Sequence, residues 1–175
     1  GAEGIKRAVR AGVRSIEHGS LMDDEAIALM KQRGTWLVAD IWNGDYTDSV
    51  GREQKWPADI LQKNTETTEF QRAGFRKAVA QGVKIAYGTD SGLYPHGLNA
   101  MQLPYMVKYG MTPMQAIQAA TISAADLMQW KDSVGSLSPG KYADIIAVEG
   151  DALADLKSFM KVGFVMKGGT VYKSP

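Results

Sequence analysis

Two stretches decide the fold, VRSIEHG (residues 13–19) and VKIAYGTDSG (residues 83–92). Each is a short run of strand-forming residues that ends in a polar side chain, His18 in the first and Asp90 in the second. A helical pattern precedes each run and ends at a glycine, which is typical of a helix followed by a strand. Such helix–strand alternation predicts a parallel sheet in an α/β protein.

The same alternation extends outward from these stretches over the first two thirds of the chain. Residues 43–57 are polar and rich in turn formers, and they predict a long loop of the kind that carries function. After residue 134 the pattern changes to short β runs separated by Gly and Pro turns. The predicted helices cover about 3–11, 24–32, 58–80 and a segment from 113 onward, and the predicted strands cover 13–18, 35–39, 83–87, 135–137, 143–148, 163–166 and 170–172.

A parallel sheet built from βα units is either doubly wound or a barrel. The glycine-rich phosphate turns of doubly wound nucleotide-binding folds do not occur in the sequence. A (β/α)₈ barrel needs roughly 250 residues, and this chain of 175 residues holds about half of the required units. We therefore expect half of a barrel over residues 1–133, followed by a small β module over 134–175. Because the sequence begins directly in a helical pattern and without Met, we expect a fragment of a longer protein.

Composition excludes several classes of function. The chain is 45% hydrophobic and 22% charged, as in an ordinary globular domain, with a formal net charge of +1 and no basic block. We therefore expect no nucleic-acid partner. No apolar run reaches the length of a membrane span, and no signal-peptide core is present in the first thirty residues. The absence of cysteine excludes disulfides and thiolate zinc sites and leaves the compartment open.

Histidine is scarce, since only His18 and His96 occur. The ends of the predicted parallel strands carry His18, Asp40 and Asp90, and the carboxyl ends of barrel strands are where such folds place their chemistry. An imidazole and a carboxylate that converge there suit a divalent metal, and the carboxylate can take a proton from an attacking water. Each residue also has a structural reading: His18 as a hydrogen-bonded strand end, Asp90 as a turn cap, and Asp40 as a hydrogen-bonded carboxylate.

In this order, the motifs resemble the amidohydrolase superfamily, and more narrowly its imidazolonepropionase-like and Xaa-Pro dipeptidase or carboxypeptidase branch. The resemblance covers nearly the whole chain. It is carried by GIKRAVRAGV (4–13), SIEHG (15–19), GTDSG (88–92), VGSL (134–137), GKYADII (140–146) and VMKGG (165–169). It implies the C-terminal half of a TIM barrel, strands 6–8, followed by the C-terminal strands of a small β-sandwich.

The resemblance also implies roles for individual residues. His18 would be a metal ligand, and Asp90 would be both a metal ligand and the catalytic residue that shuttles the proton. The cofactor would be zinc, as one or two divalent ions. The family's remaining ligands, on barrel strands 1, 4 and 5, have no counterpart in this sequence. His96, Trp42 and Tyr46 are candidate substrate-binding residues at the same mouth, with a solvated loop as the alternative for His96 and core packing as the alternative for Trp42.

The predicted function is hydrolysis of a C–N bond in a dipeptide or N-acyl amino acid. A cyclic amide substrate, as in imidazolonepropionase, is the nearest alternative. A rival reading is a non-catalytic assembly unit, since half a barrel leaves sheet edges to be covered by a second copy or by the missing N-terminal part. A metal-free βα binding domain is a third reading, and the pairing of His18 with Asp90 argues against it.

Overall fold

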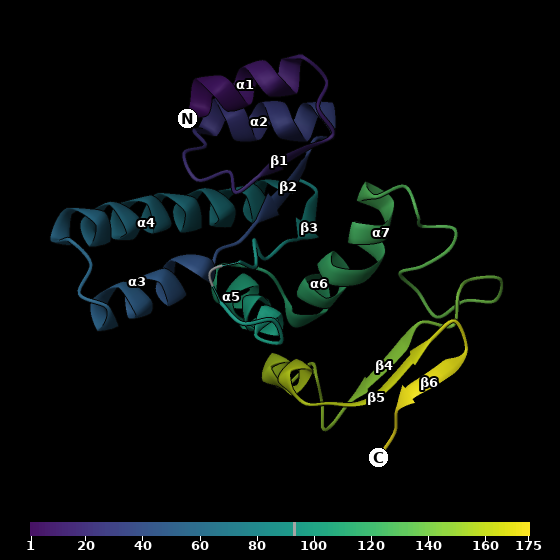
Figure 1. Cartoon of the computed structure of the whole chain (residues 1–175). Helices are drawn as coiled ribbons and strands as arrows, with labels where there is room; N and C mark the ends of the chain where they lie inside the picture. The colour runs from purple at the N-terminus through teal and green to yellow at the C-terminus, as the bar shows by residue number, and fades with distance from the viewer. Residues whose placement is uncertain (93) are drawn as a thin grey trace.

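The computed structural model describes residues 1–92 and 94–175, and it contains two separate three-stranded sheets (Figure 1). The first is parallel, in the order β1 (Ser15–Glu17), β2 (Trp36–Ala39), β3 (Ile85–Tyr87). The second is antiparallel, in the order β4 (Ile145–Val148), β5 (Val162–Lys167), β6 (Thr170–Lys173). The mixed α/β class and the change of pattern along the chain are thus as predicted, with β1 to β4 shorter, and β5 and β6 slightly longer, than the sequence suggests.

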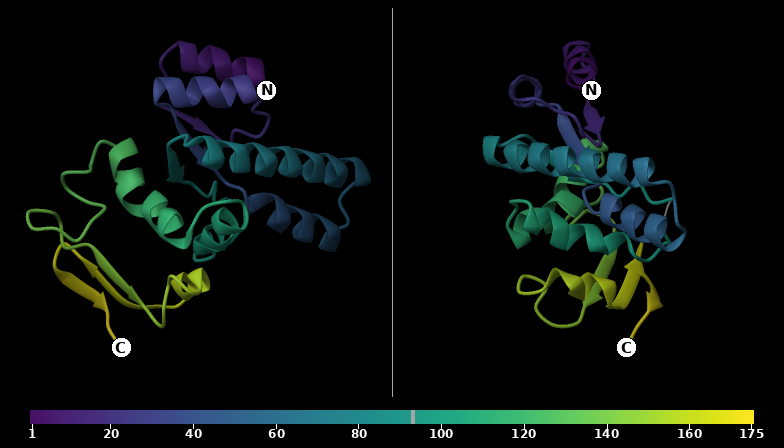
Figure 2. Two further views of the ribbon diagram at one scale, coloured as in Figure 1. Left: turned by 180° about the vertical axis from the view of Figure 1, so that it is seen from behind. Right: turned by 90° about the vertical axis from the view of Figure 1, so that its left-hand side faces the viewer.

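Helices fill the intervals between the strands. Figures 1 and 2 show α1 and α2 at one end of the molecule, the long α4 beside α3, and the antiparallel sheet at the opposite end. The helical elements are α1 (Ala2–Arg10), α2 (Asp24–Arg33), α3 (Asn43–Glu53), α4 (Ala58–Gln81), η1 (Asn99–Met101), α5 (Gln102–Lys108), α6 (Pro113–Gln118), the π-helical η2 (Ala119–Ser123), α7 (Ala124–Leu127) and η3 (Leu156–Met160).

The predicted helix ends are confirmed by their local hydrogen bonds. The Asp23 side chain accepts from the Ala26 N–H at 2.7 Å and so caps α2. Gly34 and Gly82 end α2 and α4 in the left-handed conformation, which glycine adopts without strain. Thr112 forms a full capping box at the start of α6.

The predicted loop at 43–57 is wrong over most of its length, because Asn43–Glu53 forms α3. Its sequence has low helix propensity, with glycine at two positions, so the helix depends on packing against α4. The glycines permit that packing: a Cβ at Gly44 would lie 1.9 Å from the Thr68 hydroxyl oxygen, and one at Gly51 would lie 2.6 Å from a Leu61 methyl. Tertiary contact therefore overrides local preference.

The predicted strand at 135–137 is also not formed. Gly135 has a φ of +90°, and a Cβ there would lie 2.7 Å from the Ala125 methyl and 3.0 Å from the Thr121 carbonyl oxygen. The chain is held against the preceding helical segment by the Val134 N–H, which donates to the Trp130 carbonyl at 3.0 Å. This segment consequently follows the helix instead of joining a sheet.

The core lies between the parallel sheet and its helices. Its largest fully buried side chains include Phe75 from α4, Leu37 from β2, and Ile27 and Met30 from α2. Leu156 of η3 belongs to the same cluster, so the C-terminal third of the chain is anchored to it. No helix in the described residues is both long and apolar enough to span a membrane.

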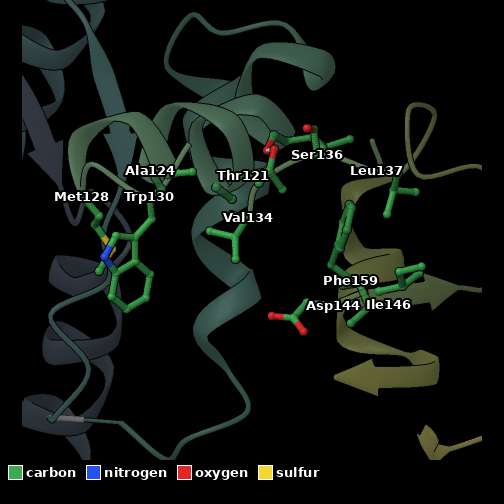
Figure 3. Close-up of a pocket in the computed structure, with 15 residues that line it drawn as sticks. Thr121, Ala124, Met128, Trp130, Val134, Ser136, Leu137, Asp144, Ile146 and Phe159 are labelled. Atoms are coloured by element: carbon green, nitrogen blue, oxygen red, sulfur yellow. Dashed lines mark hydrogen bonds between the residues drawn. The ribbon is translucent and has the colours of Figure 1, made fainter. Parts of the chain in front are cut away.

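An open apolar groove of about 520 Å³ lies between the α6–α7 segment and the antiparallel sheet. In Figure 3, Met128 and Trp130 stand on the helical side, and Phe159, Ile146 and Leu137 stand on the other. Ile117, Thr121, Ala124 and Met128, which share one face of the helical segment from residue 113, line this groove, and Met128 is 59% exposed. This face is therefore open in the described chain.

Candidate metal centre

Three potential metal ligands meet at the carboxyl edge of the parallel sheet. His18 directly follows β1, Asp40 directly follows β2, and Asp90 comes three residues after β3. The register pairs Glu17 with Val38 and Ala39 with Tyr87, so the three strand ends are level to within one residue. One ligand atom from each of His18, Asp40 and Asp90 lies within 4.8 Å of the others.

His18 turns sharply away from its strand. Its φ is +62°, while its N–H still donates to the Val38 carbonyl at 2.9 Å. The imidazole Nδ1 lies 3.1 Å from the Asp40 Oδ1, and about half of the side chain is exposed (51%). The backbone therefore holds the ring at the sheet edge, with one nitrogen engaged by a carboxylate.

Asp40 is the buried member of the three and is 7% exposed. Its Oδ1 accepts from the Gln71 Nε2 at 2.6 Å and faces His18, and its Oδ2 accepts from the Asn43 Nδ2 at 3.3 Å. The sequence-based interpretation as a hydrogen-bonded carboxylate is confirmed. What it did not show is that one of the partners is His18.

Asp90 is exposed and has a φ of +46°. The Asn43 Nδ2 lies 3.5 Å from its Oδ2 and so spans Asp40 and Asp90. The Asn43 Oδ1 is buried and has no hydrogen-bond partner among the described residues. A buried oxygen without a partner is a feature expected where an ion or a water completes the hydrogen bonding.

Two of the non-glycine residues with left-handed backbone lie at this edge of the parallel sheet. Lys55 and Gln129 have positive φ just after α3 and α7, where helices ordinarily end in this conformation. His18 and Asp90 instead follow strands. Left-handed backbone at such residues costs about 1–3 kcal/mol each and clusters at functional sites. Here both residues belong to the cluster of potential metal ligands formed by His18, Asp40 and Asp90.

The donor set fits a divalent metal. Zinc takes imidazole nitrogen and carboxylate oxygen, which are the atoms that His18, Asp40 and Asp90 provide. Asp40 already has three side-chain hydrogen-bond partners, whereas His18 and Asp90 have one each among the described residues, so His18 and Asp90 are the better candidates for ligands.

Aromatic side chains gather on the same side of the sheet. Trp42 packs against Tyr46 and Tyr94, with ring centroids 5.7 and 4.6 Å apart, and Tyr46 and Tyr94 are 5.4 Å apart. Trp42 and Tyr94 are buried, at 8% and 4% exposure. The structure thus brings together two of the sequence candidates, adds Tyr94, and leaves His96 on an exposed turn. Tyr94 lies four residues after Asp90, and that proximity is the signal that could have identified it.

A partly buried ionic network supports the segment that follows β2. Arg72 donates to the Ile41 carbonyl at 3.0–3.1 Å and pairs with Asp45 at 2.6 Å. The Tyr105 hydroxyl donates to the other Asp45 oxygen at 2.5 Å. Burial and the neighbouring Asp45 carboxylate raise the pKa of Tyr105 to about 12. The hydroxyl therefore stays protonated and keeps donating across the physiological range.

A parallel sheet that gathers polar side chains such as His18, Asp40 and Asp90 at its carboxyl edge is the arrangement in which α/β enzymes build their sites. The chain belongs to the amidohydrolase family, which it matches over residues 1–172. It is 35% identical to the ochratoxinase of Aspergillus niger and 30% identical to the imidazolonepropionase of Brevibacillus brevis. The first alignment covers all of this chain and 37% of the relative, and the second covers 97% and 43%.

Solved structures agree with these relationships. The chain superposes on a Xaa-Pro dipeptidase with methionine bound in its active site, with a TM-score of 0.91 and 43% identity. That superposition covers 99% of this chain and 43% of the dipeptidase. The crystal structure of the A. niger ochratoxinase gives a TM-score of 0.86 at 34% identity, over all of this chain and 40% of that one. The chain thus spans about two fifths of the length of these relatives.

Proposed function

We propose that this chain forms part of a metal-dependent amidohydrolase that cleaves the C–N bond of a dipeptide or N-acyl amino acid. The observation that carries the proposal is the convergence of His18, Asp40 and Asp90 within 4.8 Å at the carboxyl edge of the parallel sheet. Membership of the amidohydrolase family supports hydrolysis of a C–N bond as the reaction at this site.

His18 and Asp90 would hold the metal, with zinc as the expected ion. When bound, such an ion polarises the scissile carbonyl and makes water a stronger nucleophile. Asp90 accepts the proton of the attacking water and delivers it to the leaving nitrogen, which is general acid–base catalysis. Asp90 is suited to this role because it is exposed and retains a carboxylate oxygen that is not in contact with Asn43.

The substrate class is inferred from the relatives and from the aromatic cluster. The 43% identity to a Xaa-Pro dipeptidase favours a dipeptide, and the 35% identity to ochratoxinase favours an amide of similar type. Tyr46, which is only partly buried, would contact the apolar part of the substrate, with the buried Trp42 and Tyr94 packed behind it, and His96 would contact the polar end. The 30% identity to an imidazolonepropionase supports a cyclic amide as the second candidate.

For the architecture, we propose that residues 1–133 are the C-terminal half of a (β/α)₈ barrel and that 134–175 are strands of a β-sandwich. Two features support this: the parallel order β1-β2-β3 and the separate antiparallel sheet. A half-barrel needs cover for its edges. We therefore propose that the chain associates with a second copy or with further barrel strands, and the open apolar groove is one surface available for that contact.

A chimera tests this function. The chain replaces the corresponding 43% of the Xaa-Pro dipeptidase, whose ligands on the other strands then complete the centre. We expect zinc-dependent hydrolysis of Xaa-Pro dipeptides or N-acyl amino acids, and its loss in the Asp90→Asn chimera. Preference for a cyclic amide would favour the second candidate. A folded, zinc-loaded chimera that hydrolyses none of these substrates would indicate a non-catalytic assembly unit.

A further inference from the structure

One side chain outside the group formed by His18, Asp40 and Asp90 contacts two of these three residues. Gln71 lies in the middle of α4, 53 residues from His18 and 31 from Asp40, and is 7% exposed. Its Nε2 donates to the Asp40 Oδ1 at 2.6 Å and to the His18 carbonyl at 3.2 Å. An amide nitrogen has two hydrogens, so these bonds use its full donor capacity.

The hydrogen bond from Gln71 to Asp40 fixes the carboxylate oxygen of Asp40 that faces His18. The same Oδ1 that accepts from Gln71 lies 3.1 Å from the His18 Nδ1. An ionised carboxylate only accepts hydrogen bonds, so the Nδ1 must carry the proton in this contact. In the neutral ring the Nε2 is then bare and able to bind a metal.

The bond from Gln71 to the His18 carbonyl acts on the backbone. His18 has a φ of +62°, a conformation that a residue with a Cβ keeps only when its surroundings enforce it. The Gln71 amide donates a hydrogen bond to the carbonyl of His18 itself and so holds this backbone in place. A single side chain thus secures both the backbone of His18 and the partner of its ring.

We propose that Gln71 is a positioning residue that, through Asp40 and the His18 carbonyl, holds His18 as the Nδ1-protonated tautomer with Nε2 free for a metal. The tautomer follows from the hydrogen-bond geometry alone, and the metal-binding consequence rests on the function proposed above. Partners that orient a ligating histidine in this way typically change metal affinity by roughly 10–100-fold when they are removed.

The chain offers a matched control. Gln102 of α5 is also a buried glutamine, at 1% exposure, and it also holds the segment around Asp40. Its side chain bonds only backbone, donating to the Ala39 carbonyl and accepting from the Trp42 N–H. Gln71→Met and Gln102→Met therefore remove comparable buried amides, but only the first removes a contact to Asp40 and His18.

The first measurement is the ring tautomer in the metal-free chain, from two-bond ¹H–¹⁵N spectra at about pH 9, where a free imidazole is neutral. Only two histidines contribute, and the exposed His96 is the internal reference. We expect the Nδ1-protonated form of His18 in the wild type and in Gln102→Met, and a mixture of tautomers in Gln71→Met. Gln71→Asn keeps the amide but shortens the side chain, and it is the milder variant if Gln71→Met does not fold. We expect it to shift His18 in the same direction.

The second measurement is a zinc titration of the same samples, followed through the His18 signals. We expect Gln71→Met to raise the zinc Kd by about 10-fold or more and Gln102→Met to leave it at the wild-type value. A wild-type tautomer in both Gln71 variants, or equal shifts in Gln71→Met and Gln102→Met, would overturn the proposal. A wild-type chain with ordered His18 but no response to zinc would show that two ligands are too few without the further barrel strands; the tautomer still decides the role of Gln71, and the chimera described above tests the proposed function separately.

Discussion

The two sheets of this protein differ in almost every physical respect. In the parallel sheet, β2 and β3 are almost entirely buried, and all the strand ends carry polar groups engaged with one another. In the antiparallel sheet, every residue of β6 is exposed. The ion pairs found in the described part of the chain all lie between residues 3 and 77. Packing and ion pairs are thus concentrated in the part of the chain that contains the parallel sheet.

The difference shows why the centre can hold strained residues. The left-handed backbone of His18 is held on both sides, because its N–H donates to the Val38 carbonyl and its carbonyl accepts from Gln71. The antiparallel sheet has no such surroundings in the described residues, and its apolar side chains border an open groove. We therefore expect the catalytic site at the parallel sheet and contact with further polypeptide at the antiparallel sheet.

The largest effect is expected at Asp90. In the dipeptidase chimera, Asp90→Asn keeps the shape but removes the proton acceptor, so kcat should fall by about 10²–10⁴-fold. His96→Asn should mainly raise KM if His96 contacts substrate in ground and transition states alike. Steady-state kinetics, after zinc content and folding are checked, separate the two. Retention of more than about a tenth of kcat in Asp90→Asn would make Asp90 a structural cap.

Core truncation should separate the two sheets in stability. Phe75 is fully buried, so Phe75→Ala should lower the free energy of unfolding by about 3–5 kcal/mol. Tyr172 on β6 is 72% exposed, so Tyr172→Ala should change it by no more than about 0.5 kcal/mol. Urea unfolding of both variants measures the contrast. A loss above about 1 kcal/mol for Tyr172→Ala would show that β6 is covered in solution.

A smaller effect is expected where α3 meets α4. Gly44→Ala places a methyl group 1.9 Å from the Thr68 hydroxyl oxygen, and overpacking of this kind lowers stability by about 1–3 kcal/mol. Thr68→Ala removes the obstructing atoms, so the double variant should recover part of the loss. Thermal unfolding of the single and double variants tests this coupling. Simple additivity would mean that α3 shifts away from α4 without strain.

Acid should weaken the α1–α2 end through Lys6, whose ammonium lies 2.9 Å from Glu25 and 3.2 Å from Asp23. The hydrogen bond from Lys6 lowers the pKa of Glu25, and bonds from the Ala26 N–H and then Lys6 lower the pKa of Asp23. Carboxyls with a lowered folded-state pKa stabilise the fold above their ordinary pKa, and this stabilisation is lost as the pH falls through the folded-state value.

The free energy of unfolding should therefore decrease between about pH 5 and pH 2, and Lys6→Met should make that decrease shallower. Urea unfolding at several pH values measures both slopes. The matched variant Lys173→Met, on β6, should leave the slope unchanged, because the Lys173 ammonium donates to the Val162 carbonyl and not to a carboxylate. Equal slopes for the wild type and Lys6→Met would exclude this ionic contribution.

Much of the candidate site could be predicted from sequence because its signals are local. His18 and Asp90 each end a run of strand-forming residues, and parallel strands bring their carboxyl ends together. The capping motifs at Asp23 and Thr112 are equally local, since the cap and its partner lie three residues apart. Family resemblance added the expected roles of these residues.

The helix α3 and the role of Gln71 were decided by tertiary structure. The sequence of α3 favours a loop, and the helix exists because its glycines let it pack closely on α4. Gln71 lies on a helix with no motif around it, and its partners are 31 and 53 residues away. The sequence by itself determined which strands end in side chains that can bind a metal or transfer a proton. Only the folded chain determined which distant amide orients that chemistry, because a hydrogen bond depends on positions in space and not on spacing along the chain.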